Sequence, residues 1–158
     1  MVSLRTLVGD DADVLADRNF QLLLLASISS PLGASVVSPI LTELTGPFGV
    51  SATRAGLLMS AFTAPAIVFI PLVGGLSDRY GRKPVLTAGL ALFGAAGLAV
   101  PAAAAVPPGV PLLTEFRAAL GLRLLQGVGY TGIAPVLITA TGDIFDGDAE
   151  ATAQGLRF

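Results

Sequence analysis

Four long stretches of this chain carry almost no charge, and they restrict its fold more than any other feature. They span residues 19–43, 54–77, 84–106 and 112–141. Each could cross a hydrocarbon core of about 30 Å, because about 20 apolar residues in a helix reach that length. Backbone groups in lipid must be paired within the segment, and the stretches lack the alternation of a barrel strand, so helices are favoured. The sequence therefore predicts an all-α membrane protein with four transmembrane helices.

Composition agrees with this class and removes several chemistries. Only 13% of the residues are charged, whereas soluble domains carry about 25%. The chain has no Cys and no His, which excludes disulfides, zinc sites built from these residues and a Ser-His-Asp triad. Its net charge of −2 does not suggest nucleic acid as a partner. We therefore expect no enzyme, no metal and no cofactor, and we expect the lipid bilayer as a partner.

The basic residues predict how the chain lies in the membrane. The short segment 78–83 contains three of them and the acidic tail of residues 1–18 adds two, whereas the opposite ends of the spans carry only Arg54 and Arg117. An excess of Lys and Arg marks the cytoplasmic side, and acids count little. We therefore place the tail, the 78–83 hairpin and both termini in the cytoplasm, in a multi-pass protein of the cell membrane.

Small residues recur every four positions in three of the spans. They are Ala26, Ser30, Ala34 and Ser38; Gly56, Ser60 and Ala64; and Ala91, Ala95 and Ala99. Such stripes allow helix backbones to approach closely in lipid. We expect close packing along them, and the alternative is that small residues are simply abundant, with 19 glycines in the chain.

Charge is concentrated between the second and third spans, in the sequence GGLSDRYGRKPVL. Gly81 permits a turn with positive φ, and Pro84 suits the first turn of the next helix. Arg82 and Lys83 can extend to lipid head groups. From charge alone, the segment is a positive anchor on the cytoplasmic side. Asp78 still requires a partner, because an acid at a span end helps neither topology nor lipid binding.

The order of residues in this hairpin resembles a signature of the major facilitator superfamily of transporters. The matching residues are Gly74, Leu76, Ser77, Asp78, Arg79, Gly81, Arg82, Lys83 and Leu86. In that family the signature lies between helices two and three, which is its place here. A second stretch, RLLQGVGYTG, resembles the fourth-helix signature of the family through Arg123, Gln126, Gly127 and Gly129. Tyr130 and Thr131 depart from the small residues that often follow.

The resemblance implies that residues 19–158 form part of the N-terminal, six-helix half of a major facilitator fold. They would supply four spans and the start of a fifth helix, and the remaining helices of a transporter are missing from this chain. Family members transport by alternating access between two such halves. Because the resemblance is to multidrug and proton antiporter members, it implies that the complete protein exports an unknown small molecule with the proton as coupling ion.

Three residues of the fourth span are candidates for the substrate or proton pathway: Arg123, Gln126 and Tyr130. Their spacing places them on one face of a helix, and a charged residue inside a span usually faces a cavity or a partner. The resemblance associates Arg123 with proton transfer. The alternative is a hydrogen-bonded post between helices.

Asp143 follows the fourth span, where the family often has an acid that pairs with the hairpin arginines. We expect a cytoplasmic charge cluster that helps to hold one conformation of the transport cycle. Its members would be Asp78, Arg79, Arg82, Lys83 and Asp143. The alternative for Asp143 is a solvated loop acid.

The fourth span also contains GVGYTG, in which Gly127, Gly129 and Gly132 match a dinucleotide-binding fingerprint. That fingerprint requires a preceding strand and a surrounding βαβ unit. Here it lies in an apolar helical stretch, so we expect no nucleotide site.

Two other classes remain open. One is an inactive, membrane-embedded fragment with no transport activity of its own. The other is a small four-helix exporter that dimerises. Such exporters typically rely on an acid inside the first span, and residues 19–42 contain none.

Overall fold

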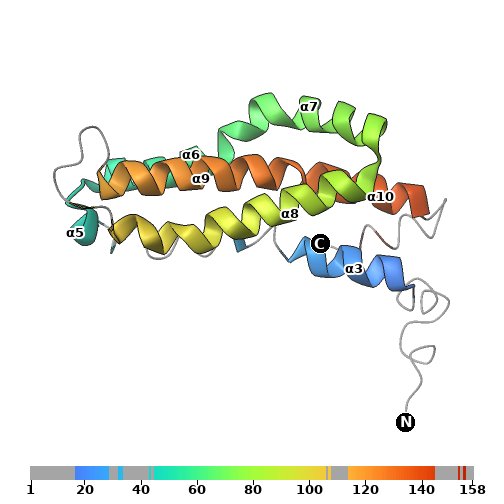
Figure 1. Ribbon diagram of the computed structural model, residues 1–158, viewed down its shortest axis with the longest axis horizontal. Coiled ribbons are helices and arrows are strands. Elements are labelled where there is room, and N and C mark those ends of the chain that lie inside the picture. Colours follow the sequence, from blue (N-terminus) through green and yellow to red (C-terminus); the bar gives the residue numbers. More distant parts are fainter. Residues whose placement is uncertain are drawn as a thin grey trace, which may run out of the picture.

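The computed structural model describes residues 17–28, 32–33, 43, 45–105, 107, 114–144, 153 and 155, and the regular structure in these ranges is entirely helical (Figure 1). The helices are α3 (Arg18–Ser27), α5 (Thr45–Phe48), α6 (Ala52–Thr63), α7 (Pro65–Tyr80), α8 (Arg82–Ala99), the 3₁₀ helix η3 (Val100–Ala105), α9 (Glu115–Thr131) and α10 (Ala134–Ile144). The predicted all-α class is confirmed for this part of the chain. The tail up to residue 16, most of the first span beyond Ile28 and most of the predicted start of a fifth helix lie outside the described residues.

Three helical stretches are long and apolar enough to cross a membrane. They are Ala52–Tyr80, Arg82–Ala105 and Glu115–Ile144, with 29, 24 and 30 residues. They overlap the second, third and fourth predicted spans. At about 1.5 Å per residue, each exceeds the thickness of about 30 Å of a hydrocarbon core. The first predicted span is described mainly through the ten residues of α3.

Side-chain caps determine where three of the helices begin. The Phe20 N–H donates to Asp17 Oδ1 over 2.9 Å ahead of α3. Ser51 and Thr114 accept in the same way at the starts of α6 and α9. A capping oxygen satisfies an N–H of the first turn that has no partner within the helix. These starts are therefore encoded by single polar residues next to apolar sequence.

The turn between α7 and α8 is tighter than the predicted hairpin of residues 78–83. α7 continues to Tyr80, α8 begins at Arg82, and only Gly81 separates them. Gly81 has φ 92° and ψ 159°, a conformation that residues with a Cβ rarely adopt. Because one glycine makes the whole reversal, Asp78 lies in the last turn of a helix instead of in a loop.

Two of the membrane-length stretches are broken near proline. α6 ends at Thr63, and α7 begins at Pro65, which suits a first helical position because it has no N–H to leave unpaired. Beyond this break α7 arches over α9 and α10 (Figure 1). α9 and α10 are separated at residues 132–133, just before Pro135. Pro71 lies inside α7, and the helix continues through it.

Glycines bring α8 and α9 into backbone contact. A Cβ added at Gly129 would lie 2.5 Å from Phe93 N and 2.9 Å from the Gly89 carbonyl oxygen. A Cβ added at Gly132 would lie 3.1 Å from Gly89 Cα. A Cβ at Gly129 would require the backbone of α8 to shift, and one at Gly132 would be tighter than an ordinary contact, so the close approach depends on glycine.

The contact does not use the predicted stripe of small residues in the third span. Ala91 and Ala95 are exposed and Ala99 is half-buried, whereas Gly89, Phe93 and Ala96 are buried on the opposite face of α8. The expectation of close packing along this stripe is therefore wrong within the described residues. Of the other stripes, Gly56 has nothing within 4 Å of its added Cβ, and Ser60 and Ala64 are exposed.

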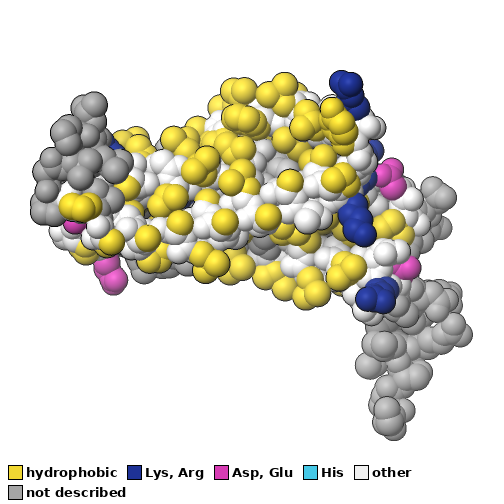
Figure 2. Space-filling view, in the orientation of Figure 1, with side chains coloured by type: hydrophobic (Ala, Val, Ile, Leu, Met, Phe, Trp, Pro, Cys, Tyr) yellow, Lys and Arg dark blue, Asp and Glu magenta, His cyan; other side chains and the backbone are white. Residues whose placement is uncertain are grey.

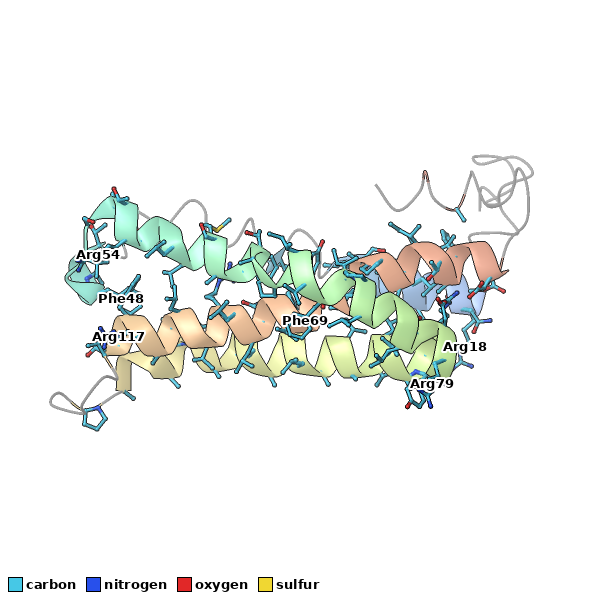
Figure 3. All side chains as sticks on the ribbon, turned by 90° about the horizontal axis from the view of Figure 1, so that it is seen from above. Arg18, Phe48, Arg54, Phe69, Arg79 and Arg117 are labelled. Carbon is cyan, nitrogen blue, oxygen red and sulfur yellow. The ribbon has the colours of Figure 1, made fainter. Side chains whose placement is uncertain are left out.

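The surface separates apolar flanks from charged ends. Large exposed apolar side chains line α7, with Ile67 83% exposed and Phe69 37% exposed. Figure 2 shows apolar atoms along the visible flank and basic side chains gathered at the end that carries the α7–α8 turn. In Figure 3, Arg18 and Arg79 lie at that end, and Arg54 and Arg117 lie at the other. This is the distribution expected of helices that cross a bilayer.

Candidate functional site

Arg123 of α9 is buried, and its side chain forms hydrogen bonds to two other helical segments and to its own helix. Arg123 is 3% exposed. Nη2 donates to the Gly33 carbonyl oxygen over 2.8 Å, and Nε donates to the Leu58 carbonyl oxygen over 3.3 Å. Nη1 donates to Gln126 Oε1 over 2.6 Å. One guanidinium therefore joins α9 to α6 and to the described part of the first span.

An aromatic cluster covers the face of this guanidinium. Arg123 Cζ lies 4.7 Å from the ring centroid of Phe62, within the range of a cation–π interaction. The Phe62 ring lies 5.3 Å from the ring of Tyr130 and 6.4 Å from that of Phe93. Tyr130 is thus connected to Arg123 through Phe62, and residues 123, 126 and 130 do share one region of the fold.

The glycines of the fourth-span signature allow this region to close. A Cβ added at Gly127 would overlap the Phe62 carbonyl group and would lie 3.1 Å from Pro65 Cγ. Gly97 of α8 makes room for the Gln126 amide, because a Cβ there would lie 2.8 Å from Gln126 Nε2. The resemblance of Gly127, Gly129 and Gly132 to a nucleotide fingerprint thus has a packing explanation, since all three contact neighbouring backbone.

The acceptors of Arg123 are all neutral. They are two backbone carbonyl oxygens and one amide oxygen, and no carboxylate pairs with Arg123 among the residues that the structure describes. A guanidinium stays protonated throughout the physiological pH range. Arg123 therefore acts as a fixed positive charge in this arrangement, and it cannot itself release and take up a proton.

The second cluster of charged residues surrounds Arg82 at the end of the bundle. Arg82 Nε donates to Asp143 Oδ2 over 2.9 Å, and Nη1 donates to Asp78 Oδ1 over 2.5 Å and to Ser77 Oγ over 3.0 Å. Charge-assisted bonds of this kind are the stronger class of hydrogen bond. Asp78, the acid that lacked an explanation from charge alone, pairs with Arg82 in the first turn of α8.

The other predicted members of the cluster lie nearby without joining it. The Arg79 guanidinium lies over the ring of Tyr80 at 5.4 Å, and neither Arg79 nor Lys83 forms an ion pair within the described ranges. Gly74 has nothing within 4 Å of its added Cβ. Of the hairpin residues, the structure therefore brings Asp78 and Arg82 together with Asp143 and leaves Arg79, Lys83 and Gly74 outside.

Sequence reasoning missed the partners of Arg123. Gly33 and Leu58 contribute only backbone oxygens, which every residue has, so no residue type could have indicated them. Phe62 is an aromatic residue in an apolar span, and it offers a weak signal at best. Only the fold shows that its ring covers the charge.

The profile of the Major Facilitator Superfamily matches residues 23–158. The chain belongs to this family. The recognition made from the hairpin and fourth-span signatures is confirmed, and the helices of the described residues fit part of a major facilitator fold. No solved structure matches the chain.

Several curated relatives carry names that refer to export or drug resistance. The chain is 34% identical over 125 residues to the bacillibactin exporter of Bacillus subtilis, covering 79% of this chain and 30% of that protein. It is 33% identical over 124 residues to the chloramphenicol resistance protein CraA of Acinetobacter baumannii, covering 78% and 27%. It is 32% identical over 83 residues to the class H tetracycline resistance protein of Pasteurella multocida, covering 51% and 20%. The chain therefore spans less than a third of the length of these relatives.

Proposed function

We propose that the protein to which these residues belong exports small molecules across a membrane by alternating access, coupled to the proton gradient. The observation that carries the proposal is the family match over residues 23–158 together with relatives named for export and drug resistance. The described residues would supply the second, third and fourth helices of the N-terminal half, with part of the first. The substrate pathway would form when the opposite half is present.

The cluster around Arg82 has the properties needed to stabilise one state of such a cycle. It joins the end of α7, the start of α8 and the end of α10 through one side chain. Its ion pairs are partly exposed, with the Arg82 side chain 29% and the Asp143 side chain 56% exposed. Pairs at that exposure are worth little stability, so they can be broken and remade within a cycle at low cost.

Arg123, Gln126 and Tyr130 are the proposed pathway residues. The guanidinium would set the local electrostatic potential, since its proton is not released at physiological pH. Any group that carries the coupling proton would then be a carboxylate near that positive charge, supplied outside the spans described above. The hydrogen-bonded post between helices is the competing role, and the two interhelical hydrogen bonds of Arg123, to Gly33 and Leu58, are consistent with both.

The proposed orientation places the α7–α8 turn in the cytoplasm. The end that carries Arg18 and Arg79 (Figure 3) also carries Arg82 and Lys83, and basic residues favour the cytoplasmic side. The molecules would then leave the cell at the end that carries Arg54 and Arg117.

The test is transport into inverted membrane vesicles that contain the protein expressed from its complete gene. Acidification of the vesicle interior should drive accumulation of a fluorescent efflux substrate, and collapse of the pH gradient by nigericin should abolish it. Accumulation that continues after nigericin has been added would contradict proton coupling. No accumulation of any tested substrate, with the protein inserted, would favour the alternative of an inactive membrane-embedded fragment. Vesicles that contain residues 1–158 alone provide the matched comparison.

A further inference from the structure

The two breaks in the membrane-length helices are built alike. At each of them a threonine precedes a proline, as Thr63 before Pro65 and as Thr131 before Pro135. Each proline lacks the N–H that would bond to the carbonyl oxygen four residues earlier. Each threonine donates from Oγ1 to the carbonyl oxygen three residues earlier, over 3.3 Å and 2.7 Å respectively. Side-chain bonds of this kind bend helices, so each break is encoded locally by two residues.

The backbone hydrogen bonds at both breaks are of the 3₁₀ type. Ile67 N–H donates to the Ala64 carbonyl oxygen over 3.3 Å. At the second break the N–H groups of Gly132 and Ile133 donate to the carbonyl oxygens three residues earlier, over 3.1 Å and 2.9 Å. An α-helix bonds across four residues, and a 3₁₀ stretch inside a long helix often marks a hinge.

The two breaks also lie close together in space. A Cβ added at Gly127 would overlap the Phe62 carbonyl group and would lie 3.1 Å from Pro65 Cγ. The first break therefore touches the last turns of α9. The second break begins at Gly132, about 8 Å further along the helix. The Phe62 ring lies 5.3 Å from the ring of Tyr130, which directly precedes that break.

The third span crosses the same level at Gly89. A Cβ added at Gly89 would lie 2.9 Å from the Gly129 carbonyl oxygen and 3.0 Å from Gly132 Cα. α8 continues through this contact, but a glycine inside a helix weakens it, and a contact between glycines has no interlocking ridges of side chains. All three membrane-length helices therefore have a weak point at one level. This bending level consists of Thr63–Pro65, Gly89 and Gly132–Ile133.

Each end of the bundle is held together separately. On one side of the bending level, Arg82 joins the ends of α7 and α10 to the start of α8. On the other side, a buried apolar cluster of Leu58, Ala103 and Ala119 joins α6, η3 and α9. Phe48 of α5 packs against that cluster. Two ends that are tied within themselves and meet at weakened helix positions can tilt relative to each other as units.

We propose that this half of the transporter bends at the bending level during the transport cycle, with the end that carries Arg82 tilting as a unit against the end that carries α5. The inference rests on the proposed export function and goes beyond it, since alternating access requires only that one half moves against the other. The bend opens or closes one end of the pathway while the other end keeps its packing. The ion pairs of Arg82 keep the three helix ends together while these pairs are formed.

Electron paramagnetic resonance tests the bend directly, through distances between spin labels in the complete protein, from which any other cysteines have been replaced. The label pair Tyr80→Cys with Thr114→Cys spans the bending level. Two control pairs lie within one end each: Tyr80→Cys with Arg18→Cys, and Arg54→Cys with Arg117→Cys. All five parent residues are exposed. Distances are compared at acidic and alkaline pH, with and without ethidium, Nile red and carboxyfluorescein, the dyes also used for accumulation in inverted vesicles.

The distance distribution of the pair that spans the bending level should shift between these conditions, while the two control pairs should keep their mean distances. Unchanged distributions for all three pairs, in a protein that accumulates one of the dyes, would overturn the inference and leave the export function standing, because this half would then move as a rigid body. Unchanged distributions together with no accumulation of any dye would count against both.

Substitution of the prolines gives an independent test. Pro65→Ala and Pro135→Ala supply the missing N–H, and each should lower dye accumulation about fivefold at unchanged insertion, because the restored hydrogen bond holds the helix straight. The double variant should lose no more than the more impaired single variant, because coupled sites are not additive. Pro84→Ala is the matched control and should stay within twofold, because Pro84 lies in the first turn of α8, where an N–H has no helical partner. Full transport in both single variants, or a double loss equal to the product of the single losses, would contradict the inference.

Discussion

The Arg82 guanidinium donates to Asp143 over 2.9 Å across 61 residues of sequence, and so connects the start of α8 to the end of α10. The same side chain donates to Asp78 and Ser77 in the last turns of α7. Three helix ends therefore meet at one arginine, and Gly81 makes this possible by reversing the chain within a single residue. Asp78 and Arg82 are four residues apart in the sequence, and the turn at Gly81 brings their side chains into contact.

Loss of the Asp143 pair should cost little stability. Asp143→Asn removes a charge whose side chain is 56% exposed, and exposed pairs contribute about 0–1 kcal/mol. The thermal unfolding midpoint of the detergent-solubilised protein, followed by circular dichroism, should therefore fall by no more than a few degrees. Glu115→Gln is the control at the opposite end of the bundle. A collapse of the fold in Asp143→Asn alone would show that the pair is structural.

Substitution at the glycine contact should be destabilising. Gly129→Ala places a methyl group 2.5 Å from Phe93 N, and overpacking of this kind costs about 1–3 kcal/mol. Gly94→Ala is the matched control, because nothing lies within 4 Å of its added Cβ and alanine favours a helix over glycine by about 0.5–1 kcal/mol. The two variants should shift the unfolding midpoint in opposite directions. Equal shifts would mean that α8 and α9 are not in backbone contact.

Removal of the ring over Arg123 should lower the free energy of unfolding more than removal of a similar ring elsewhere. Phe62→Leu loses a cation–π contact worth about 0.5–2 kcal/mol in addition to apolar contacts. Phe48→Leu serves as the comparison, since Phe48 packs edge-on against Phe116 at 5.9 Å at the far end of the bundle. Because Phe62 is buried and Phe48 is half-buried, the difference in unfolding free energy between the two variants combines the cation–π contact with a greater loss of apolar contacts. Phe62→Leu as mild as Phe48→Leu would argue against it.

The proposed orientation can be tested by cysteine labelling, because the chain contains no Cys. Tyr80 lies beside the α7–α8 turn and is 63% exposed. Thr114 is exposed at the start of α9. In intact cells a membrane-impermeant maleimide should label Thr114→Cys, and it should reach Tyr80→Cys only after permeabilisation. The reverse labelling pattern would show that the chain has the opposite orientation in the membrane.

Much of the fold was predictable because its determinants are local in the sequence. The lengths of the apolar stretches predict helices that cross a membrane, and Asp17, Ser51 and Thr114 precede three helix starts as capping residues do. The residue order from Gly74 to Leu86 was specific enough to identify the family, and Asp143 was expected beside the hairpin arginines.

The rest depended on contacts between distant segments. The stripe from Ala91 to Ala99 has the spacing of a packing face, but α8 turns Gly89 and Phe93 toward α9 instead. Which of several small-residue faces is used depends on the partner helix, and a single span does not encode it. The acceptors of Arg123 are backbone oxygens of Gly33 and Leu58, so their identity appears only when the helices are assembled.

The most direct test of the account is the transport rate of Asp78→Asn per inserted molecule in the complete protein. Substitution by Asn keeps the size of the side chain but removes the charge that pairs with Arg82. We predict a loss of up to about fivefold in proton-driven accumulation, because an exposed pair contributes up to about 1 kcal/mol, with insertion reduced much less, while Glu115→Gln retains wild-type transport. Undiminished transport in Asp78→Asn would contradict the account and would leave the hairpin as a topological anchor only.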